Sequence, residues 1–599
     1  MEEKSIGAMF YNRAKKYGDR VFLKVKGKGG YKDLSWNLVY KRAMGLGLGL
    51  MSMGLKVGER VAILSENRPE WAISDLGILS VGAVDVPIYA TNTPDQCAYI
   101  LKDSGSRFLI VSNGQQLGKI LKVRKQLDDV EKVIVMDYWE EYPYPEFVMG
   151  FHQLVDMGLK FKDEAFFVEQ IEKVKEDDLA TLIYTSGTTG EPKGVMLTHG
   201  NFLANCRDVD KANIIGDEDI ALSFLPLSHS FERTAGYYVA INAGGTIAYA
   251  EDMDHILLNL SEVRPTVMCA VPRFYEKVFS SIKANVAASP PAKQKIFNWA
   301  IGVGGKVSQR IQNKQSIPPL LSMQYKIASK LVFNQLKEKM GGRLKFFCSG
   351  GAPLAKEIAE FFHSAGILIL EGYGLTETAP ILTMNVPNDF RLGTVGKPLP
   401  SVEIKLSEPD HEILARGPNI MKGYYNLPEQ TREVLEPDGW FHTGDVGEWT
   451  EDGFLRITDR LKDLIKTSGG KYVAPQHAEG LLVQNQFIEQ ACVIGDRRKY
   501  CTVLIVPAFE QLQKWADEKG IQYKDRKDLI SKPEVKKLIG EAVEAVNKSL
   551  PSYETLKKFT ILPEEFSQEN NMLTPTLKVR RKIVTKVYDK EIEAMYPPD

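Results

Sequence analysis

The stretch that decides the fold is Leu179–Val195, LATLIYTSGTTGEPKGV, in which an apolar run leads into a loop rich in glycine and hydroxyl residues. Leu179–Tyr184 predicts a buried strand, and a helical pattern begins past His199. Glycines let several backbone N–H groups point into one concavity, hydroxyls add donors, and Lys193 adds a positive charge. This combination is typical of a polyphosphate-binding loop. The candidate phosphate-binding residues are Thr185, Ser186, Gly187, Thr188, Thr189, Gly190 and Lys193.

The loop does not have the spacing of a Walker A motif. Lys193 lies three residues after Gly190 and is followed by Gly194 rather than by serine or threonine. The kinase set of a strand lysine, HRD and DFG is not found in the sequence either. These observations argue against a P-loop NTPase and against a protein kinase. The GLGLG run at Gly45–Gly49 lacks the GxGxxG spacing and a preceding strand, so we interpret it as the small-residue face of a helix.

Strand and helix patterns alternate through the first part of the chain. Val61–Leu64 and Ala83–Tyr89 have the signal of buried strands, and Pro69–Val81 between them has that of a helix. Arg107–Ser112 and Lys132–Asp137 repeat the strand signal. The alternation predicts βαβ units and a parallel sheet covered by helices, which is an α/β fold.

The domain organisation is predicted from breaks in this pattern. A large N-terminal α/β domain of several subdomains spans 1–460, and a smaller α+β domain spans 461–599. Within the large domain, 289–340 contains two Pro-Pro pairs and otherwise has helical spacing with many lysines and glutamines. This segment predicts a helical insertion between α/β units. A length of 599 residues is in any case too long for one core, because single cores stop growing near ~250–300 residues.

Composition and charge exclude several classes of protein. The 76 Lys+Arg and 77 Asp+Glu residues give a net charge of −1, which offers no global reason to bind nucleic acid. No apolar run reaches the ~18 residues of a membrane span, and the acidic start MEEKSIGAMF does not resemble a signal peptide. The six cysteines have no CxxC spacing. We expect a cytoplasmic protein with at most peripheral membrane attachment.

Six further motifs follow the loop, and together the seven resemble the adenylate-forming superfamily. That superfamily includes acyl-CoA synthetases, luciferases and the adenylation domains of peptide synthetases. The motifs are LPLSHSFER at Leu225–Arg233, SGGAPL at Ser349–Leu354, EGYGLTET at Glu371–Thr378, GWFHTGD at Gly439–Asp445, TDRLKDLIKTSGGKYVAP at Thr458–Pro475 and LTPTLKVRR at Leu573–Arg581. The SENRPEW, LSHSFER and LTPTLK forms are most similar to those of long-chain fatty-acid–CoA ligases.

The resemblance implies a two-step reaction with ATP, Mg²⁺ and coenzyme A, in which a fatty acid is first adenylated and then passed to coenzyme A. It assigns roles residue by residue. Thr376 contacts the α-phosphate, Glu377 and Thr185 are oxygen ligands of Mg²⁺, and Lys578 reaches the substrate carboxylate. His229 resembles a gate beside the acyl pocket. The remaining nucleotide- and coenzyme-binding positions are Gly351, Ala352, Tyr373 and Gly374 for adenine, Asp445 and Arg460 for ribose, and Lys462 and Gly469 in the hinge and the coenzyme A tunnel.

Some expectations stay open on the sequence. The small domain is expected to be mobile about Lys462, and the insertion at 289–340 is either a wall of an acyl tunnel or a membrane-contacting surface. Leu577 stands where many relatives have glycine before the catalytic lysine. An acyl-AMP ligase that loads a carrier protein, or a coenzyme A ligase for another acid, is an alternative, and so is a silent binding module. No nucleic-acid partner is expected, and both a peripheral membrane contact and a homodimer are compatible with the sequence.

Overall fold

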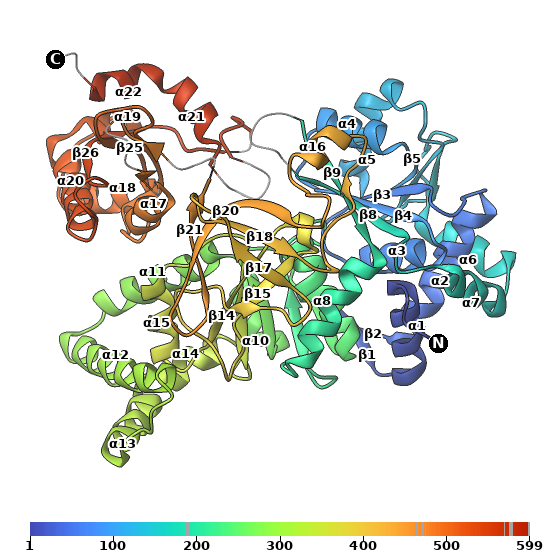
Figure 1. Ribbon diagram of the computed structural model, residues 1–599, viewed down its shortest axis with the longest axis horizontal. Coiled ribbons are helices and arrows are strands. Elements are labelled where there is room, and N and C mark those ends of the chain that lie inside the picture. Colours follow the sequence, from blue (N-terminus) through green and yellow to red (C-terminus); the bar gives the residue numbers. More distant parts are fainter. Residues whose placement is uncertain are drawn as a thin grey trace.

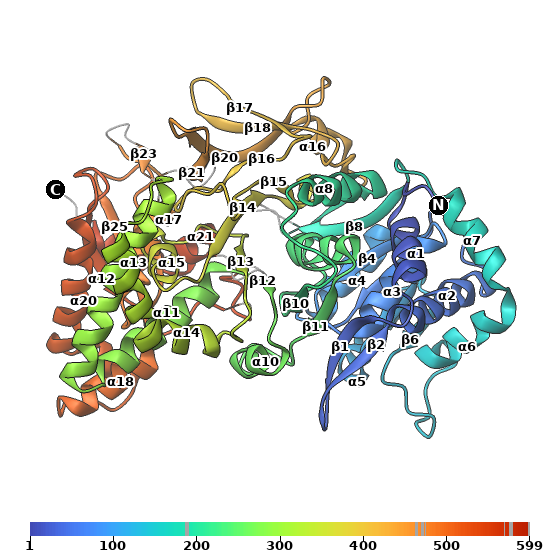
Figure 2. The ribbon, with the colours of Figure 1, turned by 90° about the horizontal axis from the view of Figure 1, so that it is seen from below.

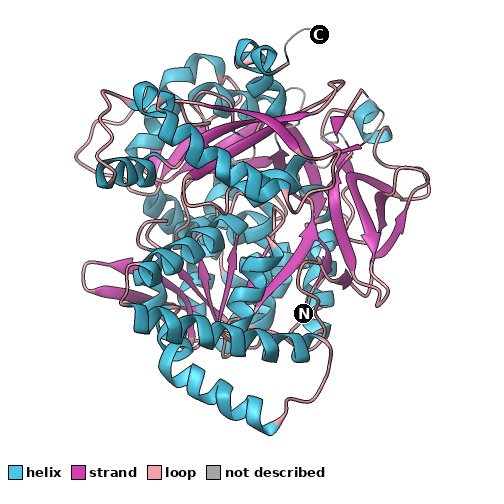
Figure 3. Cartoon of the chain, turned by 90° about the vertical axis from the view of Figure 1, so that its left-hand side faces the viewer, coloured by secondary structure: helices cyan, strands magenta, loops and turns pink. Residues whose placement is uncertain are grey.

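The computed structural model of the chain describes residues 1–185, 191–461, 465–468, 472–473, 475–567, 569–573 and 579–596. Figure 1 shows a large body built from the first three quarters of the chain and a smaller unit, in orange and red, that contains the C-terminal helices. Helices flank the strands of the body in Figure 1 and in Figure 2, and Figure 3 shows the same layering from the side. A large α/β domain followed by a smaller α+β domain is therefore confirmed as the fold class.

The first sheet has eight strands in the order β19-β9-β8-β4-β3-β5-β6-β7, and every pair from β8 to β7 is parallel. The strands are β3 (Arg60–Leu64), β4 (Val84–Ile88), β5 (Ser106–Val111), β6 (Lys132–Val135), β7 (Val148–Gly150), β8 (Leu179–Thr185), β9 (Lys193–Thr198) and β19 (Gly423–Tyr424). The helices that accompany them are α2 (Trp36–Ser52), α3 (Pro69–Ser80), α4 (Pro94–Ser104), α5 (Gly114–Val123), η1 (Arg124–Gln126), α6 (Phe151–Phe161), α7 (Glu164–Lys173) and α8 (His199–Lys211). The predicted βαβ units are confirmed.

Alternation along β3 shows why this sheet is covered on both faces. Val61 and Ile63 join one hydrophobic cluster, whereas Ala62 and Leu64 join the other. The small-residue face at Gly45–Gly49 is also confirmed, because it lies on α2 where that helix meets α6. A Cβ atom added to Gly158 of α6 would lie 1.8 Å from the Gly45 carbonyl oxygen. The two helices therefore approach more closely than a side chain at this position allows.

The second sheet has nine strands in the order β16-β15-β14-β13-β12-β10-β11-β1-β2, and the run from β14 to β1 is parallel. The strands are β1 (Val21–Gly27), β2 (Gly30–Ser35), β10 (Ile220–Ser223), β11 (Thr246–Tyr249), β12 (Val267–Ala270), β13 (Phe346–Ser349), β14 (Ile369–Gly374), β15 (Ile381–Met384) and β16 (Lys397–Pro398). Its helices are α1 (Ile6–Tyr17), η2 (Glu232–Tyr238), α9 (Val239–Ala243), α10 (Ile256–Val263), α11 (Pro272–Ala287), α15 (Lys356–Ser364) and η4 (Thr376–Thr378). The SGGAPL and EGYGLTET motifs begin where β13 and β14 approach their carboxyl ends, which is where open α/β sheets bind ligands.

Four consecutive helical elements lie in the segment 289–340, which the sequence predicts to be an insertion. They are α12 (Pro291–Gln312), α13 (Pro319–Ala328), η3 (Ser329–Phe333) and α14 (Asn334–Lys339). Proline occupies the first helical position of α12 and of α13, where its missing N–H costs no hydrogen bond. Figure 1 shows α13 at the lower edge of the molecule, beyond the rest of the large domain.

The remaining units complete the chain. An antiparallel sheet joins β17 (Glu403–Leu406), β18 (Glu412–Arg416), β20 (Phe441–Trp449) and β21 (Leu455–Arg460), with α16 (Pro428–Arg432) before β20. The smaller unit contains β22 (Ile465–Lys466), β23 (Tyr472–Val473), α17 (Pro475–Leu482), β24 (Ile488–Ile494), β25 (Cys501–Pro507), α18 (Phe509–Glu518), α19 (Arg526–Ser531), α20 (Pro533–Asn547), β26 (Leu556–Ile561), α21 (Arg581–Val587) and α22 (Asp589–Met595). Arg273 on α11 forms an ion pair with Glu489 on β24, which links the two domains. Among the described residues, no helix combines the length and the apolarity that crossing a membrane requires.

Candidate active site

The loop that follows β8 is held at both ends. Thr185 and Lys193 are paired across the β8–β9 hairpin, so the two candidate ligands at the edges of the loop lie opposite each other. The Tyr184 hydroxyl donates to Asp103 Oδ2 at 2.6 Å, and the Tyr99 hydroxyl donates to the Pro192 carbonyl oxygen at 3.0 Å. The predicted phosphate-binding residues Ser186, Gly187, Thr188, Thr189 and Gly190 lie outside the described residues.

Glu377, the predicted magnesium ligand, lies in η4 immediately after β14. The backbone N–H of Met421 donates to its carbonyl oxygen at 2.9 Å, and the Tyr424 hydroxyl donates to its Oε1 at 2.8 Å. Lys193 Nζ lies 4.7 Å from the centroid of the Tyr424 ring. Tyr424 therefore brings together a carboxylate and a lysine that are 184 positions apart in the sequence.

Tyr424 was missed by the sequence analysis. It lies in MKGYYN at Met421–Asn426, a stretch without a chemical pattern of its own. β19 pairs with β9 in antiparallel register, Tyr424 opposite Val195, and this pairing places the tyrosine beside the phosphate loop. Burial raises the pKa of Tyr424 well above its ordinary value, and Glu377 raises it further, so the hydroxyl keeps its proton and donates at neutral pH. The pair of adjacent tyrosines, Tyr424 and Tyr425, was the signal that the sequence offered.

Thr376 is tied to the LPLSHSFER motif. Its Oγ1 lies 3.2 Å from Ser230 Oγ, and the Thr234 hydroxyl donates to the Ala379 carbonyl oxygen at 3.0 Å. His229 is half-buried on the same segment, and its Nδ1 accepts from the Phe231 backbone N–H at 3.1 Å. The predicted α-phosphate contact and the predicted acyl gate are thus on segments that touch each other. The roles themselves stay predictions.

Asp445, Tyr373 and Arg460 form one cluster, as their predicted shared nucleotide requires. Asp445 on β20 and Arg460 on β21 are direct partners in the antiparallel ladder. Arg460 Nε donates to Asp445 Oδ1 at 3.1 Å, and the Tyr373 hydroxyl donates to Asp445 Oδ2 at 2.8 Å. Asp445 is buried, which strengthens these charge-assisted bonds. Each carboxylate oxygen still has a second lone pair with which to accept from a ribose hydroxyl.

The glycine-rich positions show two different physical reasons for glycine. Gly351, with a φ of +83°, and Ala352 are exposed after β13, so that backbone is available to a flat ligand. Gly374 instead allows two chains to cross, because an added Cβ would lie 1.6 Å from the Pro380 carbonyl oxygen. The two adenine motifs are also connected: Leu354 N–H donates to Glu371 Oε2 at 3.4 Å, and burial raises the pKa of Glu371 to about 7.

Three predicted residues, Lys462, Gly469 and Lys578, lie outside the described residues. Of the nearby cations in LTPTLKVRR, Arg581 is engaged within the small domain. Its Nη1 donates to Glu479 Oε1 and to the Val493 carbonyl oxygen, each at 2.6 Å. Arg581 is therefore a structural residue of the small domain rather than a substitute for Lys578.

Glu377 and Gly351 follow the parallel strands β14 and β13, Lys193 lies on β9, and Asp445 lies on the antiparallel strand β20. The fold that holds them is that of adenylate-forming enzymes. The adenylation domain of a carboxylate reductase from Mycobacterium chelonae has the same fold, with a TM-score of 0.76 and 23% identity over 100% of this chain and 92% of that chain. The structure of the anthranilate CoA ligase AuaEII in complex with anthranoyl-AMP matches with a TM-score of 0.74 and 20% sequence identity, over 99% of each chain. These similarities establish the class of the fold.

Sequence comparison gives the family. The AMP-binding enzyme model matches residues 10–425, and the AMP-binding enzyme C-terminal domain model matches 462–598. The chain is 33% identical to the long-chain-fatty-acid–CoA ligase FadD15 of Mycobacterium bovis, over 99% of this chain and 97% of that protein. It is 32% identical to the peroxisomal long chain acyl-CoA synthetase 7 of Arabidopsis thaliana, over 98% of this chain and 85% of that protein. The chain belongs to the AMP-binding enzyme family, and the predicted resemblance is confirmed.

Proposed function

We propose that this protein is a long-chain fatty-acid–CoA ligase that forms an acyl-adenylate from ATP and a fatty acid and transfers the acyl group to coenzyme A. The observation that carries the proposal is the convergence in one domain of the Tyr424–Glu377 pair beside Lys193 and the Tyr373–Asp445–Arg460 cluster. The names of the full-length relatives support the acyl substrate.

In the first half-reaction, a carboxylate oxygen of the fatty acid bonds to the α-phosphorus of ATP, and the bond to pyrophosphate breaks. Both reactants are anions, so the chain must offset their repulsion with cations and oriented donors. Lys193 and the loop after Thr185 would bind the leaving phosphates, and Thr376 would orient the α-phosphate. Asp445 and Arg460 would hold the ribose, which fixes the position of the phosphorus.

Glu377 and Thr185 would hold Mg²⁺ together with phosphate oxygens, and the donor set fits, because a carboxylate and a hydroxyl are the hard oxygen ligands that this ion prefers. When bound, the ion neutralises phosphate charge. Tyr424 orients the Glu377 carboxylate through its hydrogen bond to Oε1, which leaves Oε2 for another ligand. Lys193, 4.7 Å from the same ring, supplies further positive charge.

In the second half-reaction, the coenzyme A thiol attacks the acyl carbonyl, a C–S bond forms, the C–O bond to AMP breaks, and the thiol proton is released. We place the domain boundary at 460/461 and the hinge at Lys462, with Gly469 in the coenzyme A tunnel and Lys578 at the acyl carboxylate during adenylation. The series of family motifs on both sides of this boundary supports the assignment. We also propose that the protein contacts membranes peripherally and that it forms a homodimer.

The test is a product assay on the full chain with Mg-ATP and a panel of straight-chain acids from acetate to stearate, plus benzoate, with and without coenzyme A. We expect AMP and acyl-CoA formation that depends on coenzyme A and is greatest for long chains. Acyl-adenylate that accumulates without a thioester would point to an enzyme that loads a carrier protein. A maximum at benzoate or acetate would contradict the proposed acid.

The proposed role of Lys578 has its own test. Lys578→Ala should reduce adenylation by about a hundredfold or more, because a cation at the reacting carboxylate is lost. Transfer to coenzyme A from preformed acyl-adenylate should remain within a few-fold of the wild-type rate. Equal losses in the two half-reactions would contradict the assignment.

A further inference from the structure

The helical insertion carries a large excess of positive charge. Residues 289–340 contain eight lysines and one arginine but only one acidic residue, Glu338, so this segment has a net charge of +8 in a protein whose net charge is −1. Within the described part of the chain, Lys314 is the only one of these nine cations in an ion pair, with Asp389 at 3.0 Å. The cations are Lys293, Lys295, Lys306, Arg310, Lys314, Lys326, Lys330, Lys337 and Lys339.

The same segment exposes large apolar side chains on α13 and the turn after it. Leu320, Met323, Ile327 and Leu331 are 64%, 55%, 46% and 49% exposed. Their spacing of three or four residues places them on one face of the helix. The opposite side is already used for packing, since Ala328 and Phe333 are fully buried. The outward apolar face is therefore additional to the face that holds α13 on the protein.

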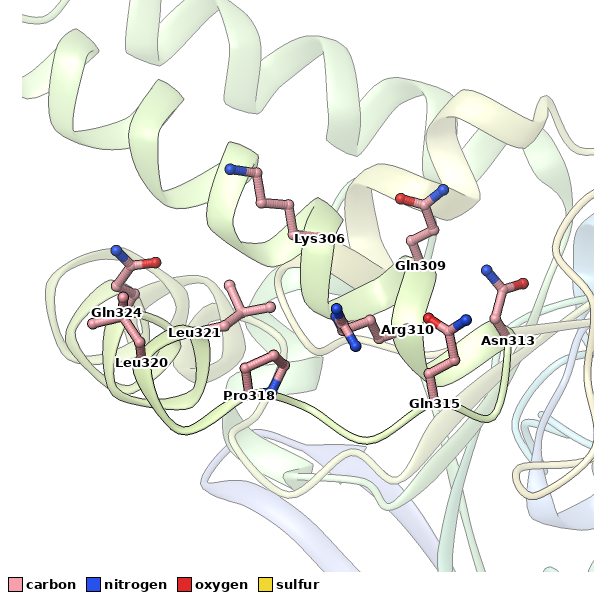
Figure 4. A pocket seen from close by; sticks show the side chains of 9 residues that line it. All are labelled: Lys306, Gln309, Arg310, Asn313, Gln315, Pro318, Leu320, Leu321 and Gln324. Carbon is pink, nitrogen blue, oxygen red and sulfur yellow. The ribbon is translucent and has the colours of Figure 1, made fainter.

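A pocket lies between the end of α12 and the start of α13. Its volume is about 610 Å³, and Figure 4 shows Lys306 and Arg310 of α12 together with Leu320, Leu321 and Gln324 of α13 around it. Arg310 Nη1 donates to the Ser316 carbonyl oxygen at 2.8 Å, which fixes the connecting loop beside the pocket. Two cations and apolar side chains thus line the same opening.

We propose that the α12–α13 helix pair, Pro291–Gln312 and Pro319–Ala328, docks the enzyme onto a bilayer that contains anionic phospholipids. The exposed face of α13 enters the interfacial region, the surrounding lysines lie over the anionic headgroups, and Lys306 and Arg310 receive a lipid phosphate in the pocket. Apolar burial and attraction to anionic lipid act together in such interfacial helices. A long-chain fatty acid is itself concentrated in bilayers, so docking would place the enzyme at its substrate.

Charge argues against the other occupants of this surface. A second copy in a two-fold dimer would place one cationic surface against an identical one, which is repulsive. A nucleic acid would use the cations but would leave Leu320, Met323 and Ile327 without a function. The inference does not rest on the proposed reaction, because membrane binding is measured without ATP, fatty acid or coenzyme A.

The experiment is co-sedimentation of the full chain with vesicles of phosphatidylcholine alone and of phosphatidylcholine mixed with phosphatidylglycerol. We expect binding to the anionic vesicles that is at least about tenfold tighter and weakens with added salt. Two double variants separate the contribution of positive charge from that of apolar contact. The first is Lys306→Glu with Arg310→Glu, and the second is Leu320→Ser with Met323→Ser. Each should weaken binding to anionic vesicles by about tenfold or more, with an unchanged melting temperature.

Matched controls use the same changes on other exposed surfaces. Lys536→Glu with Lys537→Glu reverses two charges on α20, and Val57→Ser removes an apolar side chain that is 65% exposed. Both should bind vesicles like the wild type. Equal binding to the two lipid compositions, or wild-type binding by either α12–α13 variant, would overturn the proposal. Binding to duplex DNA in a parallel assay, with no binding to either kind of vesicle, would also overturn it. So would a dimer in light scattering that Leu320→Ser with Met323→Ser dissociates while vesicle binding is absent.

Discussion

Two clusters of carboxylates in the large domain use the same residue types for opposite purposes. In the candidate active site, Glu377 and Asp445 each accept from a tyrosine hydroxyl and keep lone pairs for a ligand. In the core, Asp75 of α3 and Asp85 of β4 are completely buried around Arg233. Asp75 and Asp85 share one arginine that is itself completely buried, whereas Arg460 beside Asp445 is partly exposed, so the first pair supports the core.

Partners within the buried cluster bond both Asp75 oxygens, Asp85 Oδ2 and the Arg233 guanidinium, whereas Asp85 Oδ1 has no hydrogen-bond partner among the described residues. Arg233 Nη2 lies 2.6 Å from Asp85 Oδ2 and also contacts Asp75, and its Nη1 donates to the Thr181 hydroxyl at 2.9 Å. The Tyr238 hydroxyl donates to Asp75 Oδ2 at 3.0 Å. Burial raises the pKa of Asp85 well above its ordinary value, although Arg233 opposes this. The cluster joins α3, β4, β8 and η2, so it supports the framework next to His229, the predicted acyl gate.

The largest expected effect is that of Arg233→Ala on stability. The substitution leaves two buried carboxylates without their cation, which should lower the free energy of unfolding of the large domain by about 3–5 kcal/mol. Urea denaturation followed by circular dichroism measures this. Asp445→Ala is the matched active-site variant and should lower the free energy of unfolding by only about 1–2 kcal/mol, because Arg460, one of the two donors it leaves, is partly exposed to water. Similar stability losses in the two variants would remove the distinction between the clusters.

The second effect is a pH dependence of the free energy of unfolding that is caused by Glu232, the residue before Arg233. Glu232 is fully buried, and burial raises its pKa to about 8, above the unfolded value of 4.5. The unfolded chain therefore ionises first, and stability from this group is lost as the pH rises toward 8. Relative to the wild type, Glu232→Gln should gain on the order of 3 kcal/mol of unfolding free energy between pH 5 and pH 8.

The Glu232 comparison is made as a difference between variant and wild type, because other buried groups titrate in the same range. Glu371, whose pKa burial raises to about 7, changes stability in the same direction, and buried His199, whose pKa is lowered to about 4, changes it in the opposite one. These contributions cancel in the difference. A difference that stays constant with pH would contradict the assigned environment of Glu232.

The third effect concerns Glu377, the predicted magnesium ligand. Glu377→Gln should lower the adenylation rate by about a hundredfold and raise the Mg²⁺ concentration needed for half-maximal rate, because a charged oxygen ligand is lost. Pyrophosphate release measures both quantities. Glu357→Gln removes the same charge from an exposed position on α15 and should have no effect. Wild-type Mg²⁺ dependence in Glu377→Gln would argue that Glu377 is not a metal ligand.

The smallest effect separates Tyr424 from its neighbour. Tyr424→Phe removes the 2.8 Å hydrogen bond to Glu377 and should lower the rate by about tenfold with a moderate increase in the Mg²⁺ requirement. Tyr425→Phe removes a hydroxyl from the adjacent residue and serves as the control. If the two variants behave alike, the hydrogen bond to Glu377 has no part in catalysis.

The comparison also shows how far the sequence could be interpreted. The strands at Val61–Leu64 and Ala83–Tyr89 were predictable because buried parallel strands are continuous apolar runs. The pairing of Asp445 with Arg460 and Tyr373 was predictable as a shared nucleotide site through the family motifs. Tyr424 was not, because it comes beside Lys193 through the pairing of β19 with β9, in which Tyr424 lies opposite Val195, 229 positions away in the sequence. Glu232 and Arg233 belong to a recognised motif, but only their burial shows that they support the core.

The measurement that tests the central claim most directly follows one oxygen atom. A long-chain fatty acid labelled with ¹⁸O in both carboxylate oxygens is turned over with Mg-ATP and coenzyme A, and the products are analysed by mass spectrometry. Attack of the carboxylate on the α-phosphorus, followed by thiol attack on the carbonyl, leaves one ¹⁸O in AMP. The account predicts AMP with one labelled oxygen and unlabelled pyrophosphate. Label in orthophosphate, or AMP without label, would contradict an acyl-adenylate mechanism.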